Sequence, residues 1–287
     1  MLNRLRHAIT LLAVSAVAST ACASSADSVR TVRPVYSVYA LEAGSAHLAE
    51  TYLSPLHYDG WSLALSHTRA QAMKFEPEHW FMELGGRLAV DRTLNRPARN
   101  VAEWRLNLAL QWDMMRRWRI PSGFSLYAGG FVRLDAGVFY LARNSNNPAA
   151  AKASLTIGPR VGAGYSLRLG KVPVSLRYMV DMPLTGIFFS PAYGELYYEI
   201  YIGNHSGLVR AAWPGNFFRL DNTLTADFRF GNTMLRVGYA PRIFSSRTSD
   251  IVTRIVSHSF IFGIAQEWIS VSSEGPSEAE SRIISAY

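Results

Sequence analysis

Residues 153–169, ASLTIGPRVGAGYSLRL, alternate between two chemical types along most of their length. One set is apolar and the other is small or cationic, and successive side chains of a β-strand point to opposite faces. The run is far longer than the roughly 5–6 residues of an ordinary globular strand. The segment therefore predicts a long β-strand with one apolar face and one polar face.

The same alternation recurs along most of the chain. Clear runs begin near Trp61, Trp80, Trp104, Phe124, Val172, Phe218 and Leu235, and weaker ones cover residues 35–41, 196–202 and 252–268. Short turns at 121–123, 170–171 and 231–232 contrast with longer polar loops at 91–100, 142–150, 183–194, 203–216 and 244–251. Such asymmetry is typical of membrane barrels, so we predict an all-β fold, a transmembrane antiparallel up-and-down β-barrel of about 10–12 strands.

Arginine dominates the positive charge of this chain. Of 29 basic residues only three are lysine, which leaves 26 arginines. Sorting the strands by parity predicts a lumen-lining set of Glu83, Arg87, Arg105, Asp113, Arg133, Asp135, Arg160, Arg168, Arg177, Asp181, Arg219, Asp227, Arg229 and Arg236. Arg242, Glu199 and Asp221 share the same polar faces. Guanidinium groups pair bidentately with carboxylates, which suits a confined lumen better than lysine does.

The opposite face of these strands is almost free of charge. It carries tryptophans near strand ends, at Trp61, Trp80, Trp104, Trp112 and Trp268, as expected of a lipid-facing surface with interfacial girdles. A soluble β-sandwich or lipocalin-like barrel would also alternate and is the competing fold. A helical membrane protein is excluded, because spanning helices need about 20 apolar residues in a row. The longest uncharged runs after the N-terminal region, 120–132 and 182–194, are thirteen residues each and contain Pro or Gly.

Residues 1–23 resemble a secretory signal peptide in their order of features. Arg4 and Arg6 precede an apolar run from Ala8 to Ala18, and Ala21-Cys22-Ala23 follows, so cleavage is expected after Ala23. A lipoprotein acylated at Cys22 is the alternative. We further predict an N-terminal segment at 24–58 that is a first strand or a short helix at the barrel mouth, a barrel at 59–270 and a polar tail at 271–287. Export and a barrel together predict the outer membrane of a Gram-negative bacterium.

The sequence lacks the motifs of several kinds of functional site. The seven histidines are scattered, so no metal site is expected, and no phosphate-binding loop or other cofactor motif is present. The pI of 9.7 could indicate nucleic-acid binding, but the arginines alternate within strands instead of clustering with exposed aromatics. Nucleic acid is therefore not an expected partner.

Two short segments allow a weak enzymatic alternative, an outer-membrane lipid acyl hydrolase that uses a His/Ser pair. One contains His205 and Ser206, and the other is Ser257-His258-Ser259. Adjacent residues of a strand point to opposite faces, so neither pair could act together unless a loop relaxed the geometry. A polar turn is the simpler interpretation of residues 204–207, and no catalytic residue is predicted.

A loop-mediated binding module is the remaining alternative. The loops at 142–150, 183–194 and 244–251 are long enough to dock a partner, and Phe188, Phe189 and Tyr193 supply aromatic side chains there. Exposure of these rings would favour that function.

At residues 51–61, TYLSPLHYDGW, and at 203–207, GNHSG, the chain resembles a family of exported proteins of unknown function from Gram-negative bacteria of the Bacteroides type. The likeness extends over most of the chain after the N-terminal signal. It implies an outer-membrane β-barrel and carries no catalytic residue with it.

The sequence thus predicts a passive function: a structural barrel or a narrow channel for small, anionic solutes, with an Arg/Asp/Glu-lined lumen. Membrane lipid and a small solute are the expected partners. No substrate is indicated.

Overall fold

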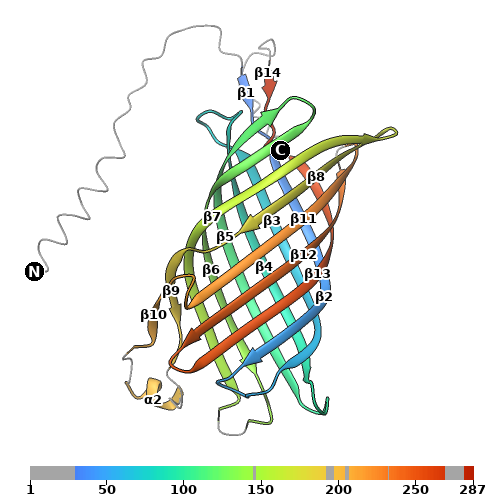
Figure 1. Ribbon diagram of the computed structural model, residues 1–287. Helices are drawn as coiled ribbons and strands as arrows, with labels where there is room; N and C mark the ends of the chain where they lie inside the picture. Colours follow the sequence, from blue (N-terminus) through green and yellow to red (C-terminus); the bar gives the residue numbers. More distant parts are fainter. Residues whose placement is uncertain (1–29, 145–146, 192–196, 204–206, 232, 269–280) are drawn as a thin grey trace, which may run out of the picture.

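Ten long antiparallel strands form a closed, tilted barrel in the computed structural model, which describes residues 30–144, 147–191, 197–203, 207–231, 233–268 and 281–287 (Figure 1). The strands are β2 (Val35–Glu50), β3 (Tyr58–Ala72), β4 (Trp80–Asn95), β5 (Ala102–Ile120), β6 (Phe124–Tyr140), β7 (Ala149–Leu169), β8 (Val172–Asp181), β11 (Phe217–Phe230), β12 (Thr233–Thr248) and β13 (Ile251–Trp268). Each pairs with its sequence neighbour, β8 pairs with β11, and β13 pairs with β2 to close the ring. The predicted fold class is confirmed.

The two ends of the barrel differ in their connections. The connections that follow β3, β5, β7 and β11 lie at one end, which we call the short-turn end. The connections that follow β2, β4, β6, β8 and β12 lie at the opposite end, which we call the long-loop end. The segments β1 (Arg30–Val32) and β14 (Ser281–Ile283) also lie at the short-turn end (Figure 1). The prediction of a long loop at 244–251 is wrong, because β12 continues to Thr248 and only two residues connect it to β13. The longest connections, β6–β7 and β8–β11, do lie at the long-loop end, as in outer-membrane barrels, whose periplasmic turns are short.

Side-chain alternation decides what each strand faces. In β13, Phe260 and Phe262 are 61% and 56% exposed on the outer wall, whereas Ile261 between them is 5% exposed and faces inward. Two aromatic groups mark the edges of the apolar outer band. Trp61 and Trp104 meet edge to face at 6.0 Å toward the long-loop end, and Arg116 lies 5.8 Å from Trp80 toward the short-turn end. The outer wall is therefore built to contact lipid.

The barrel begins earlier in the chain than the boundary predicted at residue 59. Residues Val35–Glu50 form β2, so of the two possibilities for segment 24–58 the structure has a strand over this range, with no helix at the mouth. Small residues hide the alternation there. A Cβ on Gly44 would lie 1.8 Å from the carbonyl oxygen of His258, so only glycine lets β2 approach β13 at this point.

The connection from β8 to β11 holds three short elements, β9 (Thr185–Phe189), α2 (Tyr197–Tyr201) and β10 (Val209–Ala212). β9 continues along β7 beyond the end of β8, and β10 pairs with β9. The prediction of a strand at 196–202 is wrong, because residues Tyr197–Tyr201 are helical. Glu199 therefore lies in this loop helix and not on a lumen face. No helix in the described ranges is long and apolar enough to cross a membrane.

The tail predicted as polar at 271–287 returns to the barrel in its last residues. β14 pairs with β1 in parallel, and the backbone N–H of Ile284 donates to the Val32 carbonyl at 2.9 Å. Residues 284–287 then enter the lumen at the short-turn end, where they join a buried apolar cluster that includes Tyr36, Phe81 and Met115.

Candidate functional site

The barrel interior is filled by ion pairs between strands. Twelve of the predicted lumen residues form such pairs inside the wall: Glu83, Arg87, Arg105, Asp113, Arg133, Asp135, Arg160, Arg177, Asp181, Arg219, Asp227 and Arg236. Arg229 and Arg168 are exposed instead. Arg229 pairs with Glu267 at 3.1 Å, and Arg168 lies opposite Pro173 beside the turn between β7 and β8. Both have the predicted parity, but they lie at the strand ends where the wall opens to solvent.

Arg160 joins four strands around one guanidinium group. It donates to Asp113 at 2.8 Å and to Glu83 at 3.2 Å, from β5 and β4. Its Nε also lies 3.4 Å from Asp181 of β8. One cation thus meets three carboxylates, an arrangement that holds the carboxylates close only while the guanidinium is present.

A second network lies beside the first on β6 and β11. Arg133 donates to Asp135 at 2.9 Å and reaches Asp221 at 2.7 Å. Arg219 adds contacts of 3.2 Å to both oxygens of Asp135. Two cations and two carboxylates therefore alternate, and together they link β6 to β11 across the lumen.

A third network lies nearer the short-turn end. Arg236 binds Asp227 in bidentate fashion at 2.7 and 2.8 Å, and the Tyr36 hydroxyl donates to the same carboxylate at 2.7 Å. Arg177 lies 3.5 Å from Asp227 on its other side. Planar pairing of this kind explains why arginine predominates over lysine in the interior.

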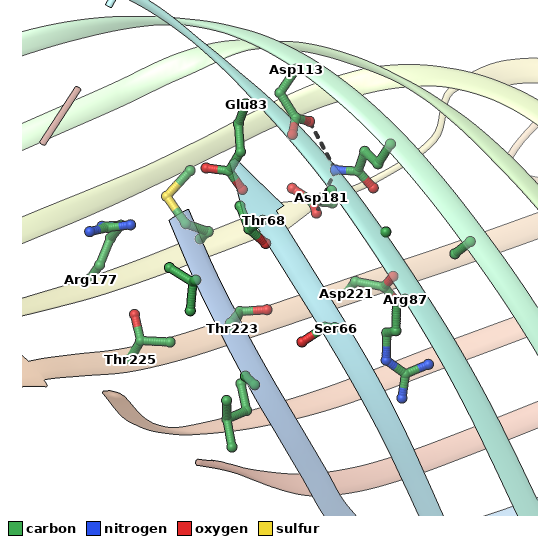
Figure 2. A pocket seen from close by; sticks show the side chains of 18 of the residues that line it. Ser66, Thr68, Glu83, Arg87, Asp113, Arg177, Asp181, Asp221, Thr223 and Thr225 are labelled. Atoms are coloured by element: carbon green, nitrogen blue, oxygen red, sulfur yellow. Dashed lines mark hydrogen bonds between the residues drawn. The ribbon is translucent and has the colours of Figure 1, made fainter. Parts of the chain in front are cut away.

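These networks surround a central cavity of about 160 Å³ (Figure 2). Serine and threonine side chains line part of it, Ser66 and Thr68 from β3 and Thr223 and Thr225 from β11 (Figure 2). Six arginines and five carboxylates complete the charged lining: Arg87, Arg133, Arg160, Arg177, Arg236, Arg242, Glu42, Glu83, Asp113, Asp181 and Asp221. The cavity is large enough for several water molecules or a small ion.

Tyr287 closes this cavity toward the short-turn end. Its hydroxyl donates to Glu83, and its ring lies 5.2 Å from both Tyr36 and Phe81. Arg117, only 2% exposed, holds the preceding residues through hydrogen bonds of 2.6 Å to the Ala286 carbonyl and 3.2 Å to the Ser285 carbonyl. Residues Ser281–Tyr287 therefore form a folded plug in the mouth, which we call the tail plug.

The long-loop end is closed by a different, mainly apolar, cluster. It contains Leu48, Leu53, Tyr58, Phe139, Leu141, Ala150 and Ile255. Beneath it Lys152 pairs with the fully buried Glu50 at 2.8 Å. A smaller cavity of about 40 Å³ lies between this cluster and the central networks, with Arg105, Lys152 and Arg219 in its lining. The lumen is thus a chain of chambers, and a wide pore is absent from the described part of the barrel.

The sequence prediction omitted several interior residues. Three of them are Asp91 on β4 and Glu103 and Arg117 on β5. All three have odd residue numbers, like the inward-facing residues Glu83 and Arg105 of the same strands. Following the alternation to the ends of these strands would have found them. Glu42, which accepts from Arg87 at 2.9 Å and Arg242 at 2.8 Å, lies on β2, where alternation is weak. Nothing in the sequence indicated that Tyr287 enters the lumen.

His258 lies on the outer wall, away from the serines beside it. Its Nδ1 is 2.7 Å from the Tyr239 hydroxyl, whereas Ser257 and Ser259 are 6% and 1% exposed and face inward. These serines cannot reach the histidine, because the wall separates them. His205 and Ser206 lie outside the described residues. No cluster of His, Cys, Asp and Glu suited to a metal ion occurs in the described ranges.

Of the aromatic residues named from the sequence in these loops, the structure describes Phe188 and Phe189, and Phe189 is half-buried. In the same connection between β8 and β11, Tyr198, Tyr201 and Trp213 are exposed. Phe188 is 5% exposed and packs with Phe217 at 5.2 Å, while Tyr193 lies outside the described residues. In α2, the Tyr197 hydroxyl accepts from the Ala151 backbone N–H at 2.6 Å, and burial raises the pKa of Tyr197 to about 12. The helix is thereby fixed to the start of β7.

Comparison with solved structures gives other barrels at low identity. The outer-membrane protease OmpT of Escherichia coli is 8% identical over 82% of this chain and 97% of its own, with a TM-score of 0.45. The translocator domain of the autotransporter NalP of Neisseria meningitidis is 10% identical over 93% of this chain and 96% of its own, with a TM-score of 0.41. An outer-membrane channel of Pseudomonas putida F1 is 7% identical over 87% and 100%, with a TM-score of 0.33.

No curated protein matches this sequence. A family model does match, over residues 7–274, and it is described as a protein of unknown function (DUF3316). The match covers the whole barrel, including every strand that carries the lumen networks. The chain therefore belongs to the DUF3316 family.

Proposed function

We propose that this protein is an outer-membrane barrel that gives small anionic solutes a narrow path, closed at rest by the tail plug. The central cavity carries the proposal. It is lined by six arginines and five carboxylates, so guanidinium groups outnumber carboxylates among the side chains that a solute would touch. Charged rings and pore-lining donors set the selectivity of such narrow paths.

Arginine donors support an anionic solute in a second way. Each guanidinium presents five N–H donors in a rigid fork, and Arg219 has a buried Nε with no hydrogen-bond partner among the described residues. An entering anion could accept from such donors as it displaces a carboxylate. The smaller cavity is lined by Arg105, Lys152 and Arg219 and by one carboxylate, Asp135, so cations predominate there too, toward the long-loop end.

The orientation follows from the connections. Short turns face the periplasm in outer-membrane barrels, so the tail plug would close the periplasmic mouth and the apolar cluster the extracellular one. Neither closure is held by strand pairing alone. The tail plug is seven residues long, whereas the apolar cluster is made of residues of the barrel strands and their loops, so the tail plug is the easier of the two to release.

Planar-bilayer recording of the refolded protein tests the proposal. We expect small, infrequent openings, with a reversal potential in a KCl gradient that shows preference for chloride. Replacing Arg133 with Gln removes a cavity-lining cation and should reduce that preference, whereas Arg168→Gln, at the exposed strand end, should leave it unchanged. Cation preference in the unmodified protein, or silence of both it and a Tyr287→Ala variant, would rule out the anion path.

A further inference from the structure

A separate cavity of about 200 Å³ lies at the short-turn end, beside the tail plug. Three arginines and three serines belong to its lining: Arg117, Arg119, Arg177, Ser125, Ser166 and Ser175. Within the described ranges no aspartate or glutamate lines it, whereas the central cavity has carboxylates among its arginines. We call this cavity the mouth pocket. Its charged lining consists of cations alone.

The strand register brings the lining of the mouth pocket together. Arg119 of β5 lies opposite Ser125 of β6, and Ser125 lies opposite Gly164 of β7. Gly164 in turn lies opposite Arg177 of β8. A Cβ on Gly164 would lie 2.8 Å from the Tyr127 hydroxyl oxygen, so the missing side chain lets the Tyr127 hydroxyl lie over β7. Two guanidinium groups and two hydroxyls from four strands therefore surround one space.

The three arginines differ in how much of their donor capacity is already used. Arg119 is exposed and has no ion-pair partner among the described residues. Arg177 has only a long contact of 3.5 Å to Asp227. Arg117 donates to the carbonyls of Ala286 and Ser285 in the tail plug, so it adds charge to the pocket without a free fork of donors. Arg119 and Arg177 thus retain N–H donors for a ligand, since each guanidinium has five.

The mouth pocket opens inside the ring of strands. Tyr287, whose ring lies in the lumen, belongs to its lining, and Arg177 and Tyr287 line both this pocket and the central cavity. The exposed side chains of Arg119 and Ser166 connect the pocket to solvent at the short-turn end. A ligand would therefore enter from the aqueous side and would stop against the tail plug.

We propose that the mouth pocket binds the phosphate group of a small soluble molecule. A phosphate carries a charge of about −2 and several acceptor oxygens, so it can accept from guanidinium and hydroxyl donors on several strands at once. Pockets for drug-sized ligands measure roughly 300–1,000 Å³, so this smaller one suits a small anion. The inference deepens the proposed function and rests on it in one respect: an anion held here stands at the entrance of the anion path.

Isothermal titration calorimetry of inorganic phosphate into the refolded full chain, in mild detergent and low salt, tests the mouth pocket. We expect one saturable site and much weaker binding of acetate, which has fewer acceptor oxygens and a single charge. Arg119→Gln removes one charge-assisted contact worth about 1.5–3 kcal/mol, so the Kd for phosphate should rise about tenfold or more.

Arg69→Gln is the matched control. Arg69 is exposed on the outer wall toward the same end of the barrel, and its replacement removes the same charge from outside the pocket. This variant should bind phosphate as the unmodified protein does, and heat-modifiable gel mobility checks that each variant is folded. Equal Kd values for folded Arg119→Gln and Arg69→Gln would overturn the proposal, as would equal affinity for acetate and phosphate.

Two further outcomes separate this site from its alternatives. Binding of dihexanoyl-phosphatidic acid without binding of inorganic phosphate would overturn the soluble source and indicate a lipid head group. Absence of phosphate binding in a protein that still shows chloride-preferring openings would refute the mouth pocket and leave the anion path standing. Phosphate binding that Arg119→Gln weakens, in a protein with silent bilayers, would support the pocket and refute the path.

Discussion

The guanidinium carbon of Arg177 lies 3.3 Å from the centroid of the Tyr287 ring, inside the barrel. Arg177 belongs to the third lumen network through Asp227, and Tyr287 also donates to Glu83 beside Arg160. A single aromatic side chain from the tail therefore contacts two of the charged networks. Cation–π contacts gain strength when the cation is buried, and Arg177 is buried. The tail plug is consequently part of the wall of the central cavity.

Truncation of this side chain should open the short-turn end. Tyr287→Ala removes the ring contacts and the hydrogen bond to Glu83, so we expect openings in planar bilayers to become at least several-fold more frequent. Tyr287→Phe keeps the stacking on Arg177 and should stay mostly closed. Ile283→Ala serves as the tail control, because Ile283 is 60% exposed. Identical recordings for Tyr287→Ala and Ile283→Ala would show that Tyr287 does not close a path.

Replacement of Arg117 should release the tail plug from β5, the strand that carries this arginine. This guanidinium donates to three backbone carbonyls, those of Ala286, Ser285 and Glu78. Hydrogen bonds from charged donors contribute about 1.5–3 kcal/mol each, so Arg117→Met should leave the tail open to proteolysis while the barrel stays intact. The measurement is limited proteolysis in detergent, with the exposed Arg119→Met on the same strand as control. A tail equally resistant in both variants would contradict this prediction.

Replacing only one partner of the buried ion pair between Asp227 and Arg236 should lower the stability of the barrel. Asp227→Asn leaves Arg236, 9% exposed, without its carboxylate, and removal of one partner of a buried pair costs about 3–5 kcal/mol. The double variant Asp227→Asn with Arg236→Gln should recover part of that loss. Urea unfolding in lipid vesicles measures both, and the exposed Asp250→Asn should change stability little. A loss below about 1 kcal/mol would show that the pair is solvated.

Two strand glycines should respond in opposite ways to the same substitution. Gly44→Ala places a Cβ 1.8 Å from the His258 carbonyl oxygen, so β2 and β13 cannot keep their spacing. We expect this variant to fail to close the barrel and to lose its heat-modifiable mobility. Gly86→Ala makes only the ordinary contact with Leu110 and should fold normally. Normal folding of Gly44→Ala would mean that the wall yields at this seam.

Much of the interior was predictable because strand parity carries over directly from sequence to wall. Arg133, Arg160 and Arg236 face the lumen because of their position in the alternation alone. Parity fails near strand ends. Arg168 and Arg229 have the numbering of lumen-facing residues but are exposed to solvent there. It fails also where residues are small, so β2 was only partly recognised and Glu42 was missed.

The sequence by itself determined the class of the fold and which face of each strand is polar and which is apolar. Period-two alternation over long runs leaves a strand only one way to bury its charges, with the polar side inward and the apolar side toward lipid. The tertiary structure alone decided which charges meet. Asp135 and Arg219 are far apart in the chain and come within 3.2 Å only because the ring of strands closes. The position of Tyr287 was decided in the same way, because a tail seven residues long acquires its contacts from strands that the closed barrel brings around it.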